Sequence, residues 1–223
     1  MPRTSPRLSR TVILDRALEI AEKTDDQPGQ ALTGRSLGDA LGVDRSAIWR
    51  HFEDKDDLLL AVADRIIGVI LESLPPSASP QKRLEEMFRA FIRTFGRYPF
   101  VASELGPRNF TLVNGSTAWE RIVAALLEMG VPSEDVVLHY RVFADVMIAL
   151  SASKAVEQQR SAEERAREFA MARAALYQLE PEDFPHTMSA IDLHLSMTDE
   201  KVAEGFLAIY WAGVRSLASA RTP

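Results

Sequence analysis

The chain has 223 residues and a formal net charge of −6, with 46% hydrophobic and 26% charged residues and no cysteine. This length suits one or two domains with a substantial core, and the composition excludes a disordered or collagen-like chain, a disulfide framework and cysteine-based catalytic or metal sites. Because no apolar run reaches the roughly 20 residues of a membrane span and no signal-peptide core follows the start, we expect a cytoplasmic protein.

The charge is unevenly distributed along the chain. Nine Lys and Arg balance nine Asp and Glu in residues 1–55, whereas 17 oppose 23 in residues 56–223. Arg3, Arg7 and Arg10 stand without an acidic residue in the first ten positions, and we expect residues 1–8 to form a flexible basic arm. The pattern disfavours a protein that coats nucleic acid through bulk charge but leaves a local DNA-contacting face open.

Helical periodicity dominates, and no run alternates as a half-buried strand would. We therefore predict an all-α fold. Ser9 is expected to cap the first helix, and the turn-forming residues 24–30 end it. Asp54 is expected to cap a longer helix. Between these lie two short predicted helices, at about 33–41 and 44–52.

The segment PPSASP at 75–80 is the clearest boundary, and it separates two predicted domains, residues 9–73 and 80–219. Ser79 followed by Pro80 is a strong signal for the start of a helix. The stretch 97–115 is broken up by Pro and Gly. The other long helices of this part are expected over about 80–96, 116–129, 133–158, 161–179 and 199–218.

The window 33–58, TGRSLGDALGVDRSAIWRHFEDKDDL, has the pattern of a helix-turn-helix: two short helices joined by a turn that contains glycine. Ile48 and Phe52 are four residues apart and can face the core. A helix this short then leaves its other side chains exposed, and their guanidinium, hydroxyl, methyl and aromatic groups suit a major groove. These side chains are Arg45, Ser46, Ala47, Trp49, Arg50 and His51.

Spacing alone leaves two interpretations of this motif open. Helix-turn-helix shapes also occur in proteins that never touch DNA, and residues 1–55 carry no net charge. On the other hand, Lys55 begins the following helix, where free amides and the helix dipole already favour a phosphate. A DNA-binding motif and a purely structural one are both compatible with these residues.

Residues 9–71 resemble the DNA-binding domain of the tetracycline-repressor family of bacterial transcription regulators, through LSRTVILDRALEIAE and LTGRSLGDALGVDRSAIWRHFEDKDDLL. The resemblance implies operator DNA as a partner. It implies base contacts from Arg35 and Arg45, with Ser46 and Ala47 beside them, backbone and base contacts from Trp49, and phosphate contacts from Thr33, Arg50, His51 and Lys55. Tyrosine is usual at the position of Trp49. Gly34 and Gly38 also depart from the family, which more often has a residue with a side chain at the first position and alanine at the second, and both glycines cost helix propensity.

Residues 80–218 resemble the family's helical ligand-binding and dimerisation domain, through RYPFVASELGPR, ALSASKAVEQQ and DEKVAEGFLAIYWAGVRSL. The resemblance implies a homodimer and a small-molecule effector of unknown identity. The last helix and the helix at 134–158 are expected to form half of a four-helix dimer interface; an internal core helix is the alternative. The predicted interface residues are Val202, Phe206, Ile209, Gly213 and Leu217.

Large apolar side chains of the central helices are candidates for an effector cavity, although each also suits an ordinary core position. They are Met87, Phe91, Trp119, Phe143 and Met147. Glu104 and Arg108 are candidates for contact with a polar effector group or for capping a loop. Glu104 and Leu71 stand where the founding member of the family has histidines for its metal and its drug, so recognition of tetracycline with magnesium is not implied.

No motif of an enzyme appears. The four histidines lack paired metal-ligand spacing, and HExxH, GxSxG and P-loop patterns are missing. We expect no catalysis, cofactor or metal. The sequence favours a ligand-responsive DNA-binding regulator, a repressor that a small molecule releases from its operator. The alternative is a helical protein–protein adaptor in which the helix-turn-helix is structural.

Overall fold

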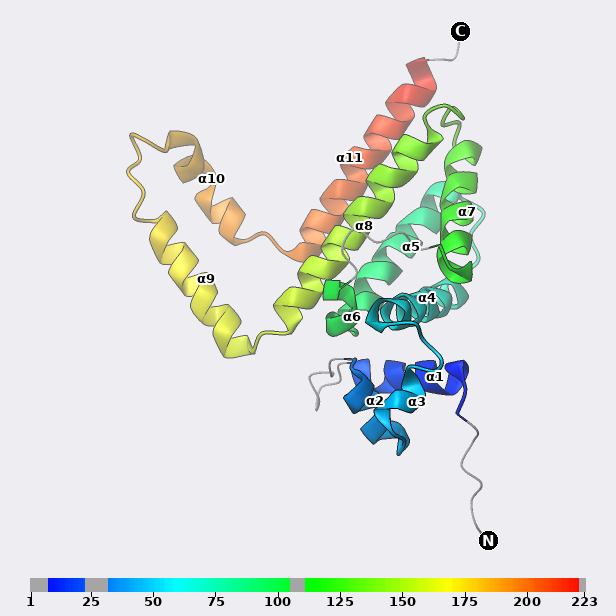
Figure 1. Ribbon diagram of the computed structural model, residues 1–223. Coiled ribbons are helices and arrows are strands. Elements are labelled where there is room, and N and C mark those ends of the chain that lie inside the picture. The colour runs from blue at the N-terminus through cyan, green and yellow to red at the C-terminus, as the bar shows by residue number, and fades with distance from the viewer. Residues whose placement is uncertain (1–7, 23–31, 105–110, 221–223) are drawn as a thin grey trace.

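The computed structural model describes residues 8–22, 32–104 and 111–220, with side chains as far as residue 216. Every regular element in these ranges is a helix, which confirms the all-α prediction (Figure 1). The predicted turn at 24–30 and the basic arm as far as residue 7 lie outside the described residues.

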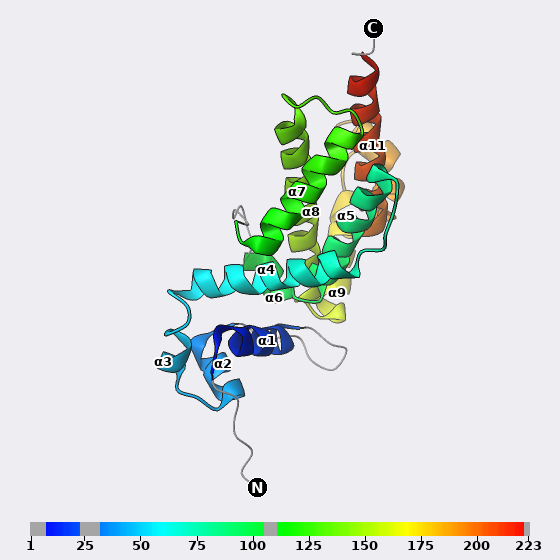
Figure 2. The ribbon, with the colours of Figure 1, turned by 90° about the vertical axis from the view of Figure 1, so that its right-hand side faces the viewer.

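Four helices build the N-terminal end: α1 (Arg10–Ala21), α2 (Gly34–Leu41), α3 (Arg45–Ile48) and α4 (Lys55–Ser73). Two predicted caps are confirmed, since Ser9 Oγ accepts a hydrogen bond from the amide of Val12 (3.3 Å) and Asp54 Oδ1 accepts one from the amide of Asp57 (2.8 Å). Figures 1 and 2 show α1–α3 grouped beneath α4, which lies between them and the rest of the molecule.

The body contains α5 (Pro80–Gly96), α6 (Pro99–Glu104), α7 (Val113–Glu128), α8 (Val136–Gln158) and α11 (Asp199–Ala220). By length and composition alone α8 would pass for a membrane-spanning helix. Its packing against α5, α6, α7 and α11 instead makes it the central helix of the body. The buried apolar residues, except Ala144 and Ile191, form one contiguous cluster that runs from α1 through α4 to α11.

Two helices, α9 (Ala162–Leu176) and α10 (Pro185–Leu195), form an arm that leaves the body between α8 and α11 (Figure 1). The predicted capping box is present: the Glu164 amide donates to Ser161 Oγ (3.1 Å), and the Ser161 amide donates to Glu164 Oε2 (2.7 Å). No residue of α9 is buried, and Ile191 is the one buried residue of α10. Contacts within the described part of this chain therefore do not explain the position of the arm.

Several predicted boundaries are wrong. The helix expected at 44–52 is only α3, followed by a tight turn, and the helices expected from 133 and to 179 begin at Val136 and end at Leu176. The stretch 97–115, expected to be broken up, contains α6 and the first turn of α7. Its Pro99 is tolerated because it is the first residue of α6, where a helix needs no amide donor, and Val101 and Ala102 are fully buried.

Candidate nucleic-acid interface and effector cavity

The two helices of the motif are held by local hydrogen bonds. Thr33 and Ser36 form a capping box at the start of α2, with both amide-to-hydroxyl distances 3.0 Å. Asp44 caps α3 by accepting a hydrogen bond from the amide of Ser46 (2.8 Å). The Ser46 hydrogen bonds lower the pKa of the Asp44 carboxyl, so a fixed negative charge lies at the start of α3 at neutral pH.

The short α3 turns its predicted core residues inward. Ile48 and Phe52 are buried, as expected from their spacing. After Ile48 the chain tightens, because the amide of His51 donates to the carbonyl of Ile48 (2.9 Å), three residues back. This turn ends α3 earlier than predicted and brings Phe52 back to the core.

The nine residues that the resemblance assigned to DNA lie on the outside of this unit. Seven are exposed and two are half-buried. No hydrogen bond or ion pair within the described chain holds the guanidinium groups of Arg35, Arg45 and Arg50. The exposed residues are Thr33, Arg35, Arg45, Ser46, Trp49, Arg50 and Lys55; the half-buried ones are Ala47 and His51.

Two glycines allow α2 and α3 to approach closely. A Cβ at Gly38 would lie 2.8 Å from the carbonyl oxygen of Val43, and a Cβ at Gly34 would lie 2.7 Å from Nε1 of Trp49. Both distances are shorter than a carbon can tolerate without a shift. At Gly38 the near atom belongs to the backbone, so there is no room for a side chain, whereas at Gly34 a side chain would have to displace the Trp49 indole.

Arg10 is a residue whose role the sequence did not reveal. Its guanidinium binds both carboxylate oxygens of Asp57 (2.7 and 3.2 Å) and donates to the carbonyl of His51 (2.8 Å). Its Cζ lies 4.3 Å from the centre of the Phe52 ring. Arg10 thus ties α1 to α4 and to the turn after α3. Sequence alone presented it as one of three arginines among the first ten residues.

Lys55 lies where the motif meets the body. Its Nζ is 3.5 Å from Oε2 of Glu104 and 5.7 Å from the centre of the Phe100 ring, both on α6. The structure thus brings a predicted phosphate contact and a predicted effector contact together, at the junction of α4 and α6. Arg108 lies outside the described residues.

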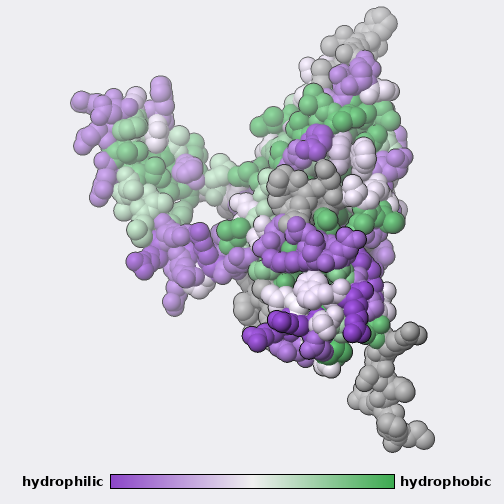
Figure 3. Space-filling view, in the orientation of Figure 1, coloured by the Kyte–Doolittle hydropathy of each residue, from purple (hydrophilic) through white to green (hydrophobic). Residues whose placement is uncertain are grey.

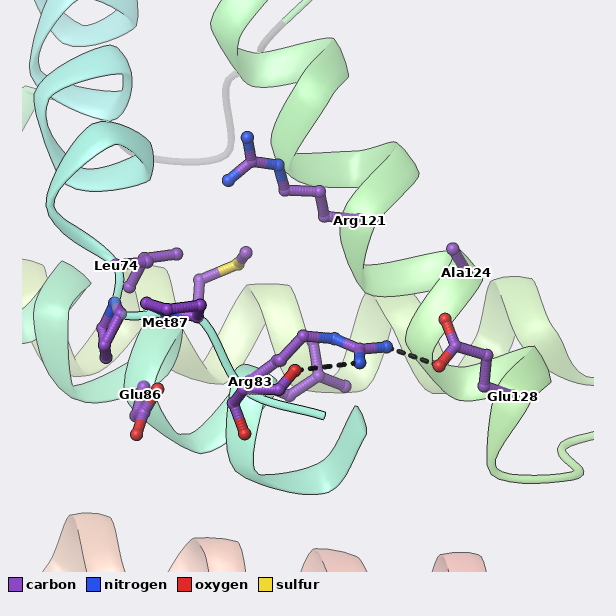
Figure 4. A pocket seen from close by; sticks show the side chains of 11 residues that line it. Leu74, Arg83, Glu86, Met87, Arg121, Ala124 and Glu128 are labelled. Carbon is purple, nitrogen blue, oxygen red and sulfur yellow. Dashed lines mark hydrogen bonds and ion pairs between the residues drawn. The ribbon is translucent and has the colours of Figure 1, made fainter. Parts of the chain in front are cut away.

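A cavity of about 510 Å³ opens between the segment after α4, the first half of α5, and α7 (Figure 4). Of the apolar effector candidates, Met87 lines it. Its lining residues are Leu74, Pro75, Pro76, Ser77, Arg83, Leu84, Glu86, Met87, Arg121, Ala124 and Glu128. The charged members of this set stand at ordinary amphipathic helix positions, and no sequence motif marks them.

The other apolar candidates are placed elsewhere. Phe91, Phe143 and Met147 are buried in the core, and Phe143 packs against Phe88 with ring centres 5.3 Å apart. Trp119 is half-exposed on α7 and stacks on Tyr140 (5.5 Å). The structure therefore does not gather the predicted effector residues around one described cavity.

The last helix has an inner and an outer face. Ala203, Leu207, Tyr210 and Trp211 are buried against the body. Of the predicted interface residues, Val202, Ile209 and Gly213 are exposed on the outer face, and Phe206 is half-buried and stacks on Phe88 (5.2 Å). The side chain of Leu217 lies outside the described set.

Exposed apolar side chains continue this outer face onto α8 and the arm. Figure 3 shows them gathered at the end of the bundle nearest the C-terminus and on the arm. On α8 they include Leu138, Val142 and Val156; on the arm and its connection to α11 they include Phe169, Met171, Tyr177, Phe184, Leu193 and Met197.

Comparison with known proteins adds three findings. The model of a family described as "Tetracyclin repressor-like, C-terminal domain" matches residues 74–216. No curated protein matches the sequence. Among solved structures, ActR of Streptomyces coelicolor in complex with actinorhodin has a TM-score of 0.80 at 21% identity, covering 95% of this chain and 97% of that chain.

Two further structures share the fold. The transcriptional regulator SCO7222, a TetR from Streptomyces coelicolor, has a TM-score of 0.76 at 20% identity and covers 95% of this chain and all of that chain. BioQ, solved with its double-stranded DNA operator, has a TM-score of 0.56 at 23% identity and covers 69% of this chain and 91% of that chain.

Proposed function

This chain belongs to the tetracycline-repressor family of transcriptional regulators, and from that premise we propose how it works as a ligand-responsive repressor. Two copies bind operator DNA through their helix-turn-helix units, and a small molecule bound in the body releases them. The observation that carries the proposal is the face formed by α2 and α3, on which three arginines have no hydrogen bond or ion pair within the described chain.

Arg45 is the residue best placed to contact bases. It is the first residue of α3 and is exposed. A guanidinium in a major groove can donate two hydrogen bonds to one guanine. Arg35 contributes from α2, and Ser46, Ala47 and Trp49 lie beside Arg45 at the groove. Thr33, Arg50, His51 and Lys55 contact phosphates, which sets the position of the protein without reading sequence.

The dimer forms through the outer faces of α8 and α11. Val202, Ile209 and Gly213 are exposed on α11, and a Cβ at Gly213 would meet nothing within 4 Å in its own chain. No contact within the described part of its own chain requires a glycine at position 213. A glycine there does allow a helix of a second copy to approach closely. The arm of α9 and α10 extends the same contact, because its apolar side chains have no core of their own.

The effector acts by shifting a conformational equilibrium. In one conformer of the dimer the two DNA-contacting helices are spaced wrongly for the operator. A ligand that binds the body more tightly in this conformer lowers operator affinity. The body reaches the DNA-binding unit through α4, through the Lys55–Glu104 ion pair and through the ion pair of Arg97 with Glu22. The structure of ActR with actinorhodin and that of BioQ with operator DNA support the same two partners here.

Members of this family are transcriptional regulators and in general not enzymes. We propose that this chain likewise has no catalytic activity and that it works in the cytoplasm, where its DNA target lies. The domain limits follow from the same proposal: residues 9–73 bind DNA, and residues 80–219 bind the effector and form the dimer.

The decisive experiment selects operator sequences from random duplexes with the full-length protein. We expect a palindrome whose half-sites are about one helical turn apart. Arg45→Ala should then cost about 1–3 kcal/mol on the selected duplex and little on scrambled DNA, measured by fluorescence anisotropy. Arg16→Ala, an exposed arginine of α1, is the matched control. If the wild-type protein enriches no sequence, the motif is structural and the adaptor alternative holds.

A further inference from the structure

We propose that the cavity between α5 and α7 binds an apolar ligand with two polar groups, an anionic oxygen held by Arg121 and a hydrogen-bond donor held by Glu86. This inference deepens the proposed function, because it names the chemical class of the effector. It follows from the state of the four charged residues in the cavity wall.

Two of the four charges neutralise each other. Arg83 Nη2 lies 2.5 Å from Oε2 of Glu128, across the cavity from α5 to α7 (Figure 4). Arg83 Nη1 also donates to the carbonyls of Ser77 and Ala78, each at 3.3 Å. These contacts occupy the Arg83 guanidinium and fix the segment after α4. Arg83 and Glu128 therefore form part of the cavity wall, and because they are paired with each other neither offers a free charge to a ligand.

Arg121 is differently placed. It extends from α7 toward the side of the cavity where Leu74 and Met87 lie (Figure 4). Within the described part of the chain its guanidinium has one hydrogen bond, from Nη1 to the carbonyl of Leu71 at 3.3 Å. The remaining N–H groups form a planar fork, which matches a carboxylate, sulfonate or phenolate oxygen. The Leu71 contact orients that fork at the mouth of the cavity.

Glu86 supplies the second polar group. It lines the cavity, and its Oε2 is closed off from solvent yet accepts no hydrogen bond from the described residues. An enclosed carboxylate oxygen without a donor is costly, and such atoms in native proteins need a partner. Rotation of the carboxylate toward the cavity would replace this unpaired position by a hydrogen bond from a hydroxyl or N–H group of a bound molecule.

The rest of the wall sets the size and polarity of the ligand. Six residues present aliphatic surface, and the volume of about 510 Å³ falls in the range of cavities for drug-sized molecules. The aliphatic residues are Leu74, Pro75, Pro76, Leu84, Met87 and Ala124. A sugar or a small inorganic ion would leave this surface uncovered, whereas a fused-ring molecule with one acid group and one donor would cover it.

The dye 1-anilinonaphthalene-8-sulfonate is a suitable probe, because it joins an apolar ring system to one N–H donor and one sulfonate. N-phenyl-1-naphthylamine has the same rings and N–H group but no sulfonate. Both fluoresce more strongly when they leave water, so each can be titrated into the full-length protein.

We expect Arg121→Met to weaken binding of the sulfonate dye about tenfold and to change binding of the uncharged dye by less than about twofold. Arg16→Met, which removes an exposed arginine of α1, should change neither. Glu86→Leu should weaken both dyes, since both carry the N–H group. Thermal unfolding shows whether each variant is folded.

Equal affinity of wild-type protein and Arg121→Met for the sulfonate dye would overturn the inference, as would an equal loss for both dyes. If the dye bound on the exposed apolar faces of α8 and α11 and not in the cavity, wild-type protein and Arg121→Met would bind the sulfonate dye equally. The dye titrations contain no DNA, so they are independent of operator selection. A negative dye result would not contradict an operator selected by the wild-type protein, and a failed selection would not contradict a positive dye result.

Discussion

The indole ring of Trp49 lies directly against Gly34: a methyl group added to this glycine would be 2.7 Å from Nε1 and 3.0 Å from Cε2 of the ring. Gly34 is the first residue of α2 and is buried, and Trp49 directly follows α3 and is partly exposed. The family usually has a tyrosine at the position of Trp49 and a residue with a side chain at the position of Gly34. The two departures are therefore one packing arrangement.

Gly34→Ala should be unfavourable only while the indole is present. In the wild-type protein the added methyl displaces Trp49, whereas in a Trp49→Ala background it meets no ring and gains up to about 0.5–1 kcal/mol of helix stability. Urea unfolding of the four proteins should give a coupling free energy of about 0.5–3 kcal/mol. Additive effects of the two substitutions would show that the contact does not constrain α2.

Arg10→Met should destabilise the DNA-binding unit by about 1 kcal/mol, because it removes a two-pronged ion pair at the surface and a cation–π contact with Phe52. Denaturant unfolding measures the loss. Arg16→Met is the control, since its ion pair with Glu19 joins neighbouring turns on the outer face of α1, and a change within about 0.5 kcal/mol is expected. Equal effects of the two variants would contradict a positioning role for Arg10.

The same ion pair gives a pH dependence with a definite sign. The hydrogen bond from Arg10, and after it the amide of Glu53, hold the pKa of Asp57 below its ordinary value of 3.8. The stability that Asp57 contributes is therefore fully present above pH 3.8 and is lost as the pH falls through the lowered pKa. The difference in unfolding free energy between wild type and Asp57→Asn should shrink as the pH is lowered from 5 toward 3. A constant difference would contradict this assignment.

Lys55 is paired with Glu104 in this structure, and the proposed function gives it a second, competing partner, a phosphate of the operator. Lys55→Ala should weaken all duplexes nearly evenly and lower the salt slope by about one unit per lost phosphate contact, or about two for the dimer. Glu104→Gln should have the opposite effect, a gain in DNA affinity of up to about fivefold, because an exposed ion pair contributes about 1 kcal/mol at most. Anisotropy titrations at several salt concentrations measure both. Weaker DNA binding by Glu104→Gln would rule out the competition.

Gly213→Leu tests the dimer without disturbing the fold of one chain. A Cβ at this position meets nothing within 4 Å in its own chain, so a larger side chain should clash only with a partner. We expect dimerisation to lose about 1–3 kcal/mol or more from overpacking, seen by sedimentation equilibrium as a population of 24.8 kDa monomers. Glu72→Leu, an exposed position near the end of α4, serves as the control. An unchanged dimer would place the interface elsewhere.

Local features of this protein were predictable from sequence because they depend on residues close together in the chain. The caps at Ser9, Asp54 and Ser161 are satisfied by amides three residues away, and the spacing of Ile48 and Phe52 was enough to turn both into the core. The helix-turn-helix could be recognised for the same reason, since its pattern occupies one short window.

The tertiary structure decided what depends on distant residues. Arg83 meets Glu128 from a position 45 residues away, and Arg121 reaches the carbonyl of Leu71 from 50 residues away, so no local pattern could reveal the cavity. Phe143 and Met147, which the sequence offered as effector residues, lie in the core of the body. Periodicity shows that a helix has an apolar face, but the neighbours of that face are fixed only when the helices pack.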